Sequence, residues 1–145
     1  MPALNTVKVE FQSNSSNEAF ARSCAACFAA QLDPTLEELG DLKTAVSEAV
    51  TNAVVHAYPK DIGPVLLKMR ILEGNTLEVT VKDWGCGIPD VEKAMEPLYT
   101  TGGEERSGMG FSIMECFMDK LRVRSTPGKG TVVVMRKKFS TRRKP

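Results

Sequence analysis

The chain has 145 residues, of which 42% are hydrophobic, so it is long enough for one domain (residues 1–145) with an ordinary core. Its nineteen Lys and Arg residues balance eighteen Asp and Glu residues, and the net charge of +1 gives no overall field that favours nucleic acid. No apolar run approaches the ~18 residues of a membrane span and the N-terminus lacks a signal-peptide apolar region, so we expect a cytoplasmic protein without nucleic-acid or membrane partners.

The first half of the chain reads as a strand and two helices. Residues 6–11 alternate apolar and polar side chains, which is typical of a half-buried strand. Residues 17–32 then favour a helix, which Asp33 and Pro34 stop because the residue before a proline avoids the helical region. A second helix is expected from about residue 35 until Tyr58 and Pro59 end it.

The second half contains two strand pairs with short helices between them. The expected elements are strands at 65–72 and 77–82, a short helix at 89–95 with Pro89 near its first turn, a helix at 109–119, and strands at 121–125 and 131–135. Residues 99–107 are polar, contain glycines and lack periodicity, so they are the candidate lid. Glu73, Gly74 and Asn75 suit the turn of the first hairpin because they tolerate positive φ.

The loops within both strand pairs are far too short for parallel crossovers. We therefore expect an α/β (α+β) two-layer sandwich, with a mixed, largely antiparallel sheet and helices on one face. Residues from about 138 to 145 carry a dense basic run, which we interpret as a flexible, solvated tail rather than a nucleic-acid site.

Four cysteines could be metal ligands or free thiols. Cys24 and Cys27 have the spacing of a zinc pair, but a structural zinc site needs a second pair or histidines. Cys86 and Cys116 are isolated, and His56 is the only histidine. Packing of small side chains in a reduced protein is the favoured interpretation.

The second helix carries the first candidate site. Its apolar stripe is wide enough to lie on a sheet and comprises Leu39, Leu42, Val46, Ala49, Val50, Ala53, Val54 and Ala57. Glu48 and Asn52 lie off this stripe and are neighbours on the helix surface because they are four residues apart. Alone, this pair could be a solvated helix face or a rigid holder of a metal-phosphate group.

Further polar and glycine-rich positions follow in order. Asp83 ends a strand and is followed by Gly85 and Gly87, and Gly108, Met109 and Gly110 open a helix. Bare backbone N–H groups at a helix N-terminus suit a phosphate group. An ordinary Asp-Gly turn is the alternative interpretation of Asp83.

These boxes resemble the ATP-binding boxes of the superfamily that contains gyrase, the heat-shock-90 chaperones, histidine kinases and mismatch-repair ATPases. A narrower similarity joins NEAFAR, SEAVTNAVVHAY, PLYTT and ERSGMGFSIMECFMD to the anti-sigma factors of endospore formation that are serine-protein kinases. The similarity covers about residues 7–137. The resemblance implies a histidine-kinase-like ATPase fold, ATP or ADP as ligand and Mg²⁺ as metal ion.

The resemblance also implies roles for single residues. Asn52 would be the Mg²⁺ ligand, Glu48 the base that takes the proton of an attacking serine, and Asp83 the acceptor for the adenine amino group. Further nucleotide contacts would come from Gly85, Gly87, Thr100, Thr101, Gly108, Met109, Gly110 and Thr131. This chain has Gly102, Gly103 and Glu104 where a basic residue and a proline commonly follow the threonine pair, so the resemblance does not imply a lysine contact to phosphate from that position.

The implied partners are a sporulation sigma factor, an anti-anti-sigma protein that carries the substrate serine, and a second copy of the chain in a homodimer. Arg22, with Glu18 as a weaker candidate, would contact the sigma factor, and Arg106 would face a phosphate or a partner. Two alternatives stay open: a module that sequesters sigma without kinase activity, and a sister kinase of the general stress response. His56 lies inside the nucleotide-covering helix, which disfavours phosphohistidine chemistry.

Overall fold

The computed structural model describes residues 2–95 and 110–140. Its strands are β1 (Ala3–Gln12), β2 (Pro64–Leu72), β3 (Thr76–Asp83), β4 (Lys120–Thr126) and β5 (Gly130–Lys138). Its helices are α1 (Asn17–Ala29), η1 (Ala30–Leu32), α2 (Leu36–Thr51), η2 (Asn52–His56), α3 (Val91–Ala94) and α4 (Gly110–Phe117). The strands form one five-stranded sheet in the order β1-β2-β3-β5-β4, and all four pairings are antiparallel.

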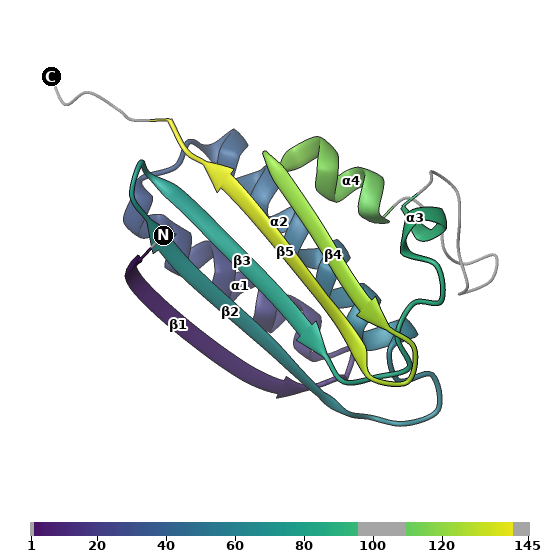
Figure 1. Ribbon diagram of the computed structural model, residues 1–145. Helices are drawn as coiled ribbons and strands as arrows, with labels where there is room; N and C mark the ends of the chain where they lie inside the picture. Colours follow the sequence, from purple (N-terminus) through teal and green to yellow (C-terminus); the bar gives the residue numbers. More distant parts are fainter. Residues whose placement is uncertain (1, 96–109, 141–145) are drawn as a thin grey trace, which may run out of the picture.

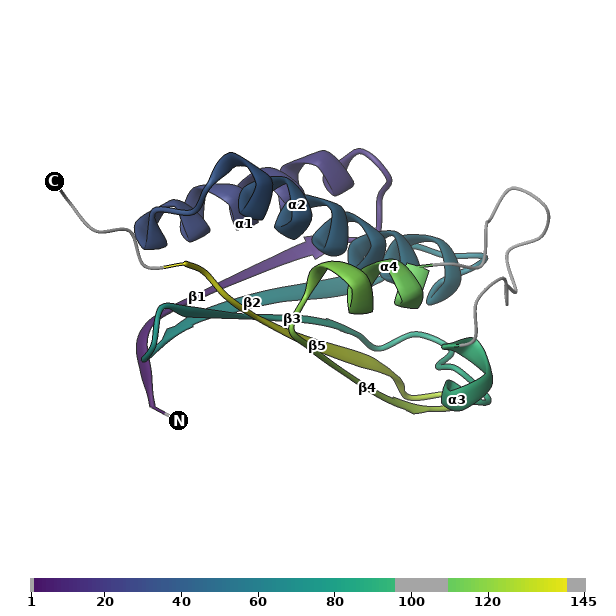
Figure 2. The same ribbon diagram turned by 90° about the horizontal axis from the view of Figure 1, so that it is seen from above.

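The helices α1, α2 and α4 cover one face of this sheet, while its other face is open (Figures 1 and 2). The period of two along each strand divides the side chains between the two faces. On β2, Val65, Leu67, Met69 and Ile71 are buried toward the helices, and the residues between them are more exposed. The predicted two-layer sandwich with a largely antiparallel sheet is confirmed.

Helix α2 is the central helix of the covering layer. A capping box begins it: the Thr35 hydroxyl accepts from the Glu38 backbone N–H, and the Glu38 carboxylate accepts from the Thr35 backbone N–H. Leu42, Val46 and Val50 have no exposed surface, and Leu39 packs against the same core. The predicted apolar stripe is therefore confirmed.

The end of this helix differs from the prediction of a regular helix up to Tyr58. Regular α-helix stops at Thr51, and residues Asn52–His56 form one π-helical segment. The terminal carbonyls bond to a distant loop: the Cys86 backbone N–H donates to Ala57 O at 2.8 Å, and the Cys86 thiol donates to His56 O at 3.1 Å. This loop satisfies backbone carbonyls that a helix end leaves unpaired. Because the hydrogen-bond partners come from a distant part of the chain, the helix sequence alone does not predict the π-helical segment.

The short helix α3 also differs in detail. It spans only Val91–Ala94, and Asp90 caps it by accepting from the Lys93 backbone N–H at 3.0 Å. Pro89 therefore precedes the cap and does not lie in the first turn. None of the helices in the described part of the chain is both long and apolar enough to cross a membrane.

The C-terminal strand extends further than predicted, so the start of a flexible tail near residue 138 is wrong. Lys138 is still part of β5, and the Phe139 side chain is buried. The Ser140 backbone N–H donates to Glu38 Oε2 at 2.8 Å, which ties the strand end to the start of α2. Residues 141–145 lie outside the described residues.

Candidate functional site

Glu48, Asn52 and Gly110 meet where α4 begins against α2. The side chains of Glu48 and Asn52 are both partly buried. Glu48 lies on the last turn of α2, and Asn52 is the first residue of η2. A Cβ atom on Gly110 would be 3.2 Å from Glu48 Oε2 and 3.7 Å from both Nδ2 and Oδ1 of Asn52. The α4 backbone therefore lies directly against the carboxylate and the carboxamide, and a larger residue would intrude on both.

Asp83 lies at the end of β3, where its side chain is 7% exposed. Its Oδ1 accepts hydrogen bonds from the Gly85 backbone N–H at 3.0 Å and from the Thr131 backbone N–H at 3.2 Å. Burial raises the pKa of this carboxyl above its usual value, although the two hydrogen bonds oppose the shift. Both bonds fix the carboxylate through one oxygen, so Oδ2 is left to accept from another donor.

The hydroxyls of Thr131 and Ser125 connect the two strands β5 and β4 at this end of the sheet. Thr131 is buried, and its Oγ1 lies 2.8 Å from Ser125 Oγ on the neighbouring strand. Ser125 Oγ also accepts from the Ile88 backbone N–H at 2.6 Å and donates to Gly130 O at 3.0 Å. The loop after Asp83 is thus held against the β4–β5 hairpin.

The two glycines after Asp83 approach other backbone segments closely. A Cβ on Gly85 would lie 2.1 Å from Ala57 O, and one on Gly87, where φ is +77°, would lie 2.4 Å from Thr126 O. These contacts require glycine for packing of the protein against itself. A close approach to a flat ligand, which the sequence suggested, stays a prediction.

Tyr58 ties the end of the helical segment to this loop. Its hydroxyl accepts from the Trp84 backbone N–H at 2.8 Å and donates to Pro64 O at 2.7 Å. Burial raises the pKa of the Tyr58 phenol above its usual value, and the charge of Asp83 adds to the shift. Tyr58 therefore holds the backbone of the residue that follows Asp83.

Sequence reasoning missed both Tyr58 and Ser125 as parts of the site. The sequence identifies Tyr58 only as a helix end, and its aromatic hydroxyl is the one signal there for a hydrogen-bonding role. Ser125 faces the same side as Leu121 and Val123, and a hydroxyl on the inward face of a strand was its only signal. Neither partner could be named without the β4–β5 register, in which Ser125 is opposite Thr131.

The structure brings Glu48, Asn52 and Gly110 together at one place, and Asp83, Gly85, Gly87 and Thr131 at the adjoining end of the sheet. The two groups are linked because the chain runs from Asn52 through η2 to Ala57, whose carbonyl bonds to the loop after Asp83. The predicted contacts Thr100, Thr101, Arg106, Gly108 and Met109, together with the candidate lid at 99–107, lie outside the described residues.

The arrangement fits a bound Mg-nucleotide in its donor types. Among residues 2–95 and 110–140, no three His, Cys, Asp or Glu side chains gather in a way that could hold a metal ion. Mg²⁺ usually takes one or two protein ligands and completes its shell with phosphate oxygens and water. The single carboxamide oxygen of Asn52, beside the α4 backbone, suits that mode of binding.

The predicted partner residues lie on α1 and contact α2. The Thr51 hydroxyl donates to Glu18 Oε1, and Arg22 Nη1 lies 3.4 Å from Ser47 Oγ. Both side chains are partly exposed, so each could also contact a partner. Phe20, on the same helix, is 52% exposed.

A family model described as the histidine kinase-like ATPase domain matches residues 11–137. An anti-sigma F factor from Caldanaerobacter subterraneus subsp. tengcongensis is 58% identical over 134 residues, which cover 92% of this chain and 93% of that protein. The chain belongs to the anti-sigma F factor family. A second member, from Pasteuria penetrans, is 58% identical over 141 residues, which cover 96% of this chain and 94% of that protein.

Solved structures show the fold of this family at lower identity. The RsbU and RsbW domains of a Mycobacterium tuberculosis protein align with a TM-score of 0.71 at 16% identity, covering 95% of this chain and 33% of theirs. Full-length ShkA in complex with AMPPNP aligns with a TM-score of 0.61 at 20% identity, covering 97% of this chain and 33% of that one. The histidine-kinase-like ATPase fold predicted from the sequence is confirmed.

Proposed function

We propose that this chain is an ATP-dependent serine-protein kinase that also binds a sporulation sigma factor and holds it inactive in the cytoplasm. Its substrate is a serine of an anti-anti-sigma protein. The observation that carries the proposal is the meeting of Glu48, Asn52 and Gly110, in a chain that belongs to the anti-sigma F factor family. The three positions supply a proton acceptor, a neutral oxygen ligand and a close-lying backbone in one place.

Adenine recognition is assigned to Asp83. With Oδ1 engaged by two backbone donors, Oδ2 accepts from the exocyclic amino group of adenine. Guanine presents a carbonyl at the corresponding position, so a carboxylate there would face an acceptor and GTP would bind poorly. Thr131, Gly85 and Gly87 complete the adenine side.

The phosphates lie toward Asn52 and the start of α4. Mg²⁺, when bound, neutralises charge on the phosphate oxygens, and Asn52 is its protein ligand. Gly108, Met109 and Gly110 supply backbone contacts to the phosphates, and Thr100 and Thr101 add hydroxyls. Glycine at position 110 leaves room between the α4 backbone and the two side chains of α2 and η2.

Glu48 is the general base. As the serine Oγ attacks the γ-phosphorus, Glu48 takes the hydroxyl proton, a new O–P bond forms, and the bond to the bridging oxygen of ADP breaks. The products are phosphoserine and ADP. Positioning and charge stabilisation supply most of the catalysis in this reaction class, so the carboxylate completes a site that other groups organise.

The sigma factor docks on α1, where Arg22 is the main charged anchor and Glu18 a lesser one, and Arg106 faces a phosphate or a partner. The active form is a homodimer. Two rivals remain: a sequestration module whose ATP only shapes the docking surface, and a kinase of the general stress response. The intact Glu48 favours the kinase over the module.

One experiment separates these possibilities. The purified protein is mixed with γ-labelled ATP and with anti-anti-sigma proteins from the sporulation and stress-response systems. We expect label on a serine of the sporulation protein. Label on the stress-response protein alone would support the sister kinase, and nucleotide binding without transfer to either would support the sequestration module.

A further inference from the structure

The proposed function does not use the open face of the sheet. Helices cover the opposite face, and the strands lie in front of them in Figure 1. Inward positions such as Leu121 and Val123 pack against the core, so the alternate residues of β4 point to the open face.

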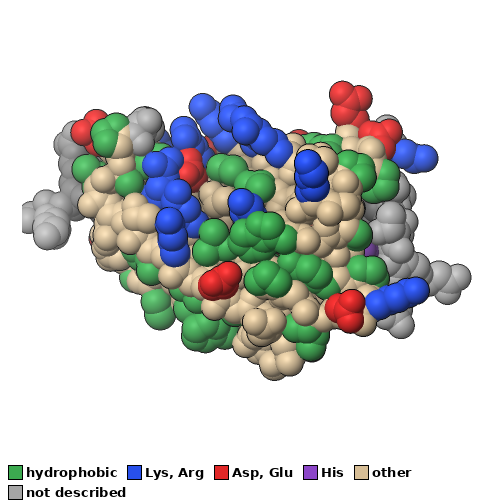
Figure 3. All heavy atoms as spheres, turned by 60° about the horizontal axis from the view of Figure 1, so that its bottom comes forward, with side chains coloured by type: hydrophobic (Ala, Val, Ile, Leu, Met, Phe, Trp, Pro, Cys, Tyr) green, Lys and Arg blue, Asp and Glu red, His purple; other side chains and the backbone are tan. Residues whose placement is uncertain are grey.

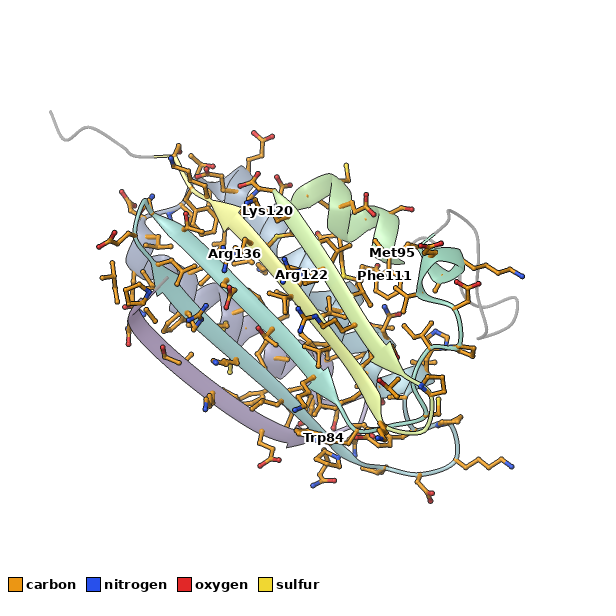
Figure 4. All side chains as sticks on the ribbon, in the orientation of Figure 1. Trp84, Met95, Phe111, Lys120, Arg122 and Arg136 are labelled. Carbon is orange, nitrogen blue, oxygen red and sulfur yellow. The ribbon has the colours of Figure 1, made fainter. Side chains whose placement is uncertain are left out.

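This face is strongly basic. We define the basic sheet face by six cations: Lys68, Lys82, Lys120, Arg122, Arg124 and Arg136. Basic side chains gather over one part of the space-filling view in Figure 3, and Figure 4 labels Lys120, Arg122 and Arg136 on neighbouring strands. Glu78, which is opposite Arg136 on the same face, offsets one of these six charges, and the remaining excess contrasts with a net charge of +1 for the whole chain.

The concentration of charge is unfavourable for the fold itself. Lys120 is directly opposite Arg136, and Lys8 is directly opposite Lys68. Like charges in such cross-strand pairs destabilise a sheet. The buried Glu78 offsets part of this cost, because it accepts hydrogen bonds from Arg70 and Arg136, each at 2.8 Å.

The centre of the basic sheet face is aliphatic rather than charged. Val132 lies between Lys82 on β3 and Arg124 on β4, and Val134 is paired with Arg122. Both valines are partly exposed. Val132 therefore has a cation on each side, and Val134 has Arg122 on one side and Thr80 on the other. Two apolar side chains beside cations match a ligand in which carboxylates alternate with aliphatic groups.

We propose that the basic sheet face docks an acidic segment of a partner protein, in which Asp or Glu residues alternate with aliphatic ones. The aliphatic side chains lie on Val132 and Val134, while the carboxylates meet Arg122, Arg124 and Lys82. The four strands that carry these cations, ~4.8 Å apart, and three rows ~7 Å apart span roughly 400 Å². That area is about half of what one partner buries in a standard interface, so the complex is transient and a short segment suffices.

Three other occupants fit the face less well. A second copy would bring like charges together across a face-to-face contact. A single-stranded nucleic acid would need aromatic stacking platforms, whereas Trp84, the aromatic residue at this end of the described face, is already covered by Lys82 at 4.9 Å from its ring centroid. An anionic membrane would need apolar side chains to insert, and the other exposed large hydrophobic residues, Leu4, Phe20, Leu36 and Ile62, are not on the basic sheet face.

Trp84 provides the measurement, because it is the only tryptophan of the chain and it contacts Lys82 at the end of the face. The full chain, held at saturating ADP so that the nucleotide site does not change, is titrated with a short synthetic peptide of alternating Glu and Val. A (dT) oligonucleotide and phosphatidylserine vesicles are titrated in parallel. We expect the peptide to change the Trp84 fluorescence and to bind more tightly than either other probe. We also expect its affinity to fall between about 0.15 M and 1 M salt, since screening shortens the Debye length from ~8 to ~3 Å.

The variant Arg122→Glu/Arg124→Glu tests the surface. The control Lys43→Glu/Lys60→Glu changes the net charge by the same amount on α2 and in the loop before β2. We expect the first to weaken peptide binding by at least about tenfold and the control to change it little. Arg122→Gln/Arg124→Gln should give an intermediate loss of peptide affinity. This variant replaces the charge-reversed one if the latter does not fold. Three results would overturn the proposal. The parent protein does not bind the peptide, both charge-reversed proteins lose peptide affinity equally, or the oligonucleotide or the vesicles bind more tightly than the peptide.

Discussion

The Asp83 carboxylate accepts a hydrogen bond from the Thr131 backbone N–H at 3.2 Å, across 48 positions of sequence. The same oxygen accepts from Gly85, so two backbone donors fix the orientation of the carboxylate. A group held in this way presents its second oxygen in a defined direction. This geometry makes the response to an amide substitution predictable.

Asp83→Asn should weaken ATP binding while the fold persists. The amide oxygen will turn to the Gly85 and Thr131 donors, which leaves the amide NH₂ facing the adenine amino group. The loss should be about 1.5–3 kcal/mol, the range for a hydrogen bond to a charged group. Calorimetric titration with ATP measures it, and Asp61→Asn, an exposed loop carboxylate, is the control. Unchanged affinity in a folded Asp83→Asn protein would remove Asp83 from the site.

Gly110→Ala and Gly40→Ala form a matched pair of glycine substitutions. The Cβ at position 110 would be 3.2 Å from Glu48 Oε2, whereas a Cβ at position 40 meets nothing within 4 Å. Gly40→Ala, within α2, should stabilise the protein by about 0.5–1 kcal/mol and leave activity unchanged. Gly110→Ala should displace the Glu48 carboxylate and lower phosphoryl transfer at similar thermal stability. Equal activity of the two variants would show that the contact at Gly110 is unimportant.

The arrangement of elements could be predicted because its signals are local. The stripe that contains Leu42 and Val46, and the alternation along β2, each follow from a period that the sequence displays directly. Short loops within the strand pairs then required antiparallel pairing. The positions of Glu48 and Asn52 on one helix surface followed from the same period.

Features that depend on distant partners could not be predicted. The π-helical segment Asn52–His56 ends against Cys86, and the hydroxyl of Tyr58 bonds to the Trp84 backbone. The order of β3, β5 and β4 decides which side chains share the open face, so Lys82 and Arg124 could not be placed on either side of Val132 from sequence. Phe139 falls in the predicted tail, yet its side chain is buried. Its burial depends on the length of β5 and on a backbone hydrogen bond from Phe139 N–H to Asn75 O, neither of which the sequence displays.

The free energy of unfolding should decrease at acidic pH, because protonation of Glu78 weakens its bonds to Arg70 and Arg136. Burial opposes ionisation of this carboxyl, but hydrogen bonds from Arg70 and Arg136 outweigh it and lower its pKa below the ordinary 4.5. The stabilisation is therefore fully present above pH 4.5 and is lost as the pH falls through the lower pKa of the folded state. Urea denaturation across this acidic range measures the slope.

The matched variant for this prediction is Glu78→Gln, which should unfold with a weaker dependence on pH in the same range. It should also be less stable near neutral pH, because it leaves two arginines without their carboxylate. Identical pH dependence in the parent and the variant would contradict the role given to Glu78.

Arg22→Glu should weaken capture of the sigma factor and leave ATP affinity unchanged, because a single charged anchor can dominate an interface. Arg22 also contacts Ser47 on α2 at 3.4 Å, so part of the effect could come from the packing of α1 on α2. Ser47→Ala removes that contact alone and is the control. A pull-down titration that finds equal sigma affinity for Arg22→Glu and the parent would exclude Arg22 from the interface.

The central claim is that Glu48 acts as the base in a kinase whose Mg²⁺ ligand is Asn52. Glu48→Gln keeps the shape of the side chain but cannot take the serine proton. Asn52→Ala removes the metal ligand, so it should lose Mg²⁺-dependent nucleotide binding itself. The two variants should therefore fail in different ways.

Single-turnover phosphorylation of the anti-anti-sigma protein, measured beside ATP affinity, decides this. For Glu48→Gln we expect phosphoryl transfer to fall by about 10²–10⁴-fold, the usual contribution of general-base catalysis, with ATP affinity nearly unchanged. A Glu48→Gln protein that transfers phosphate at the parent rate would show that this carboxylate is not the base.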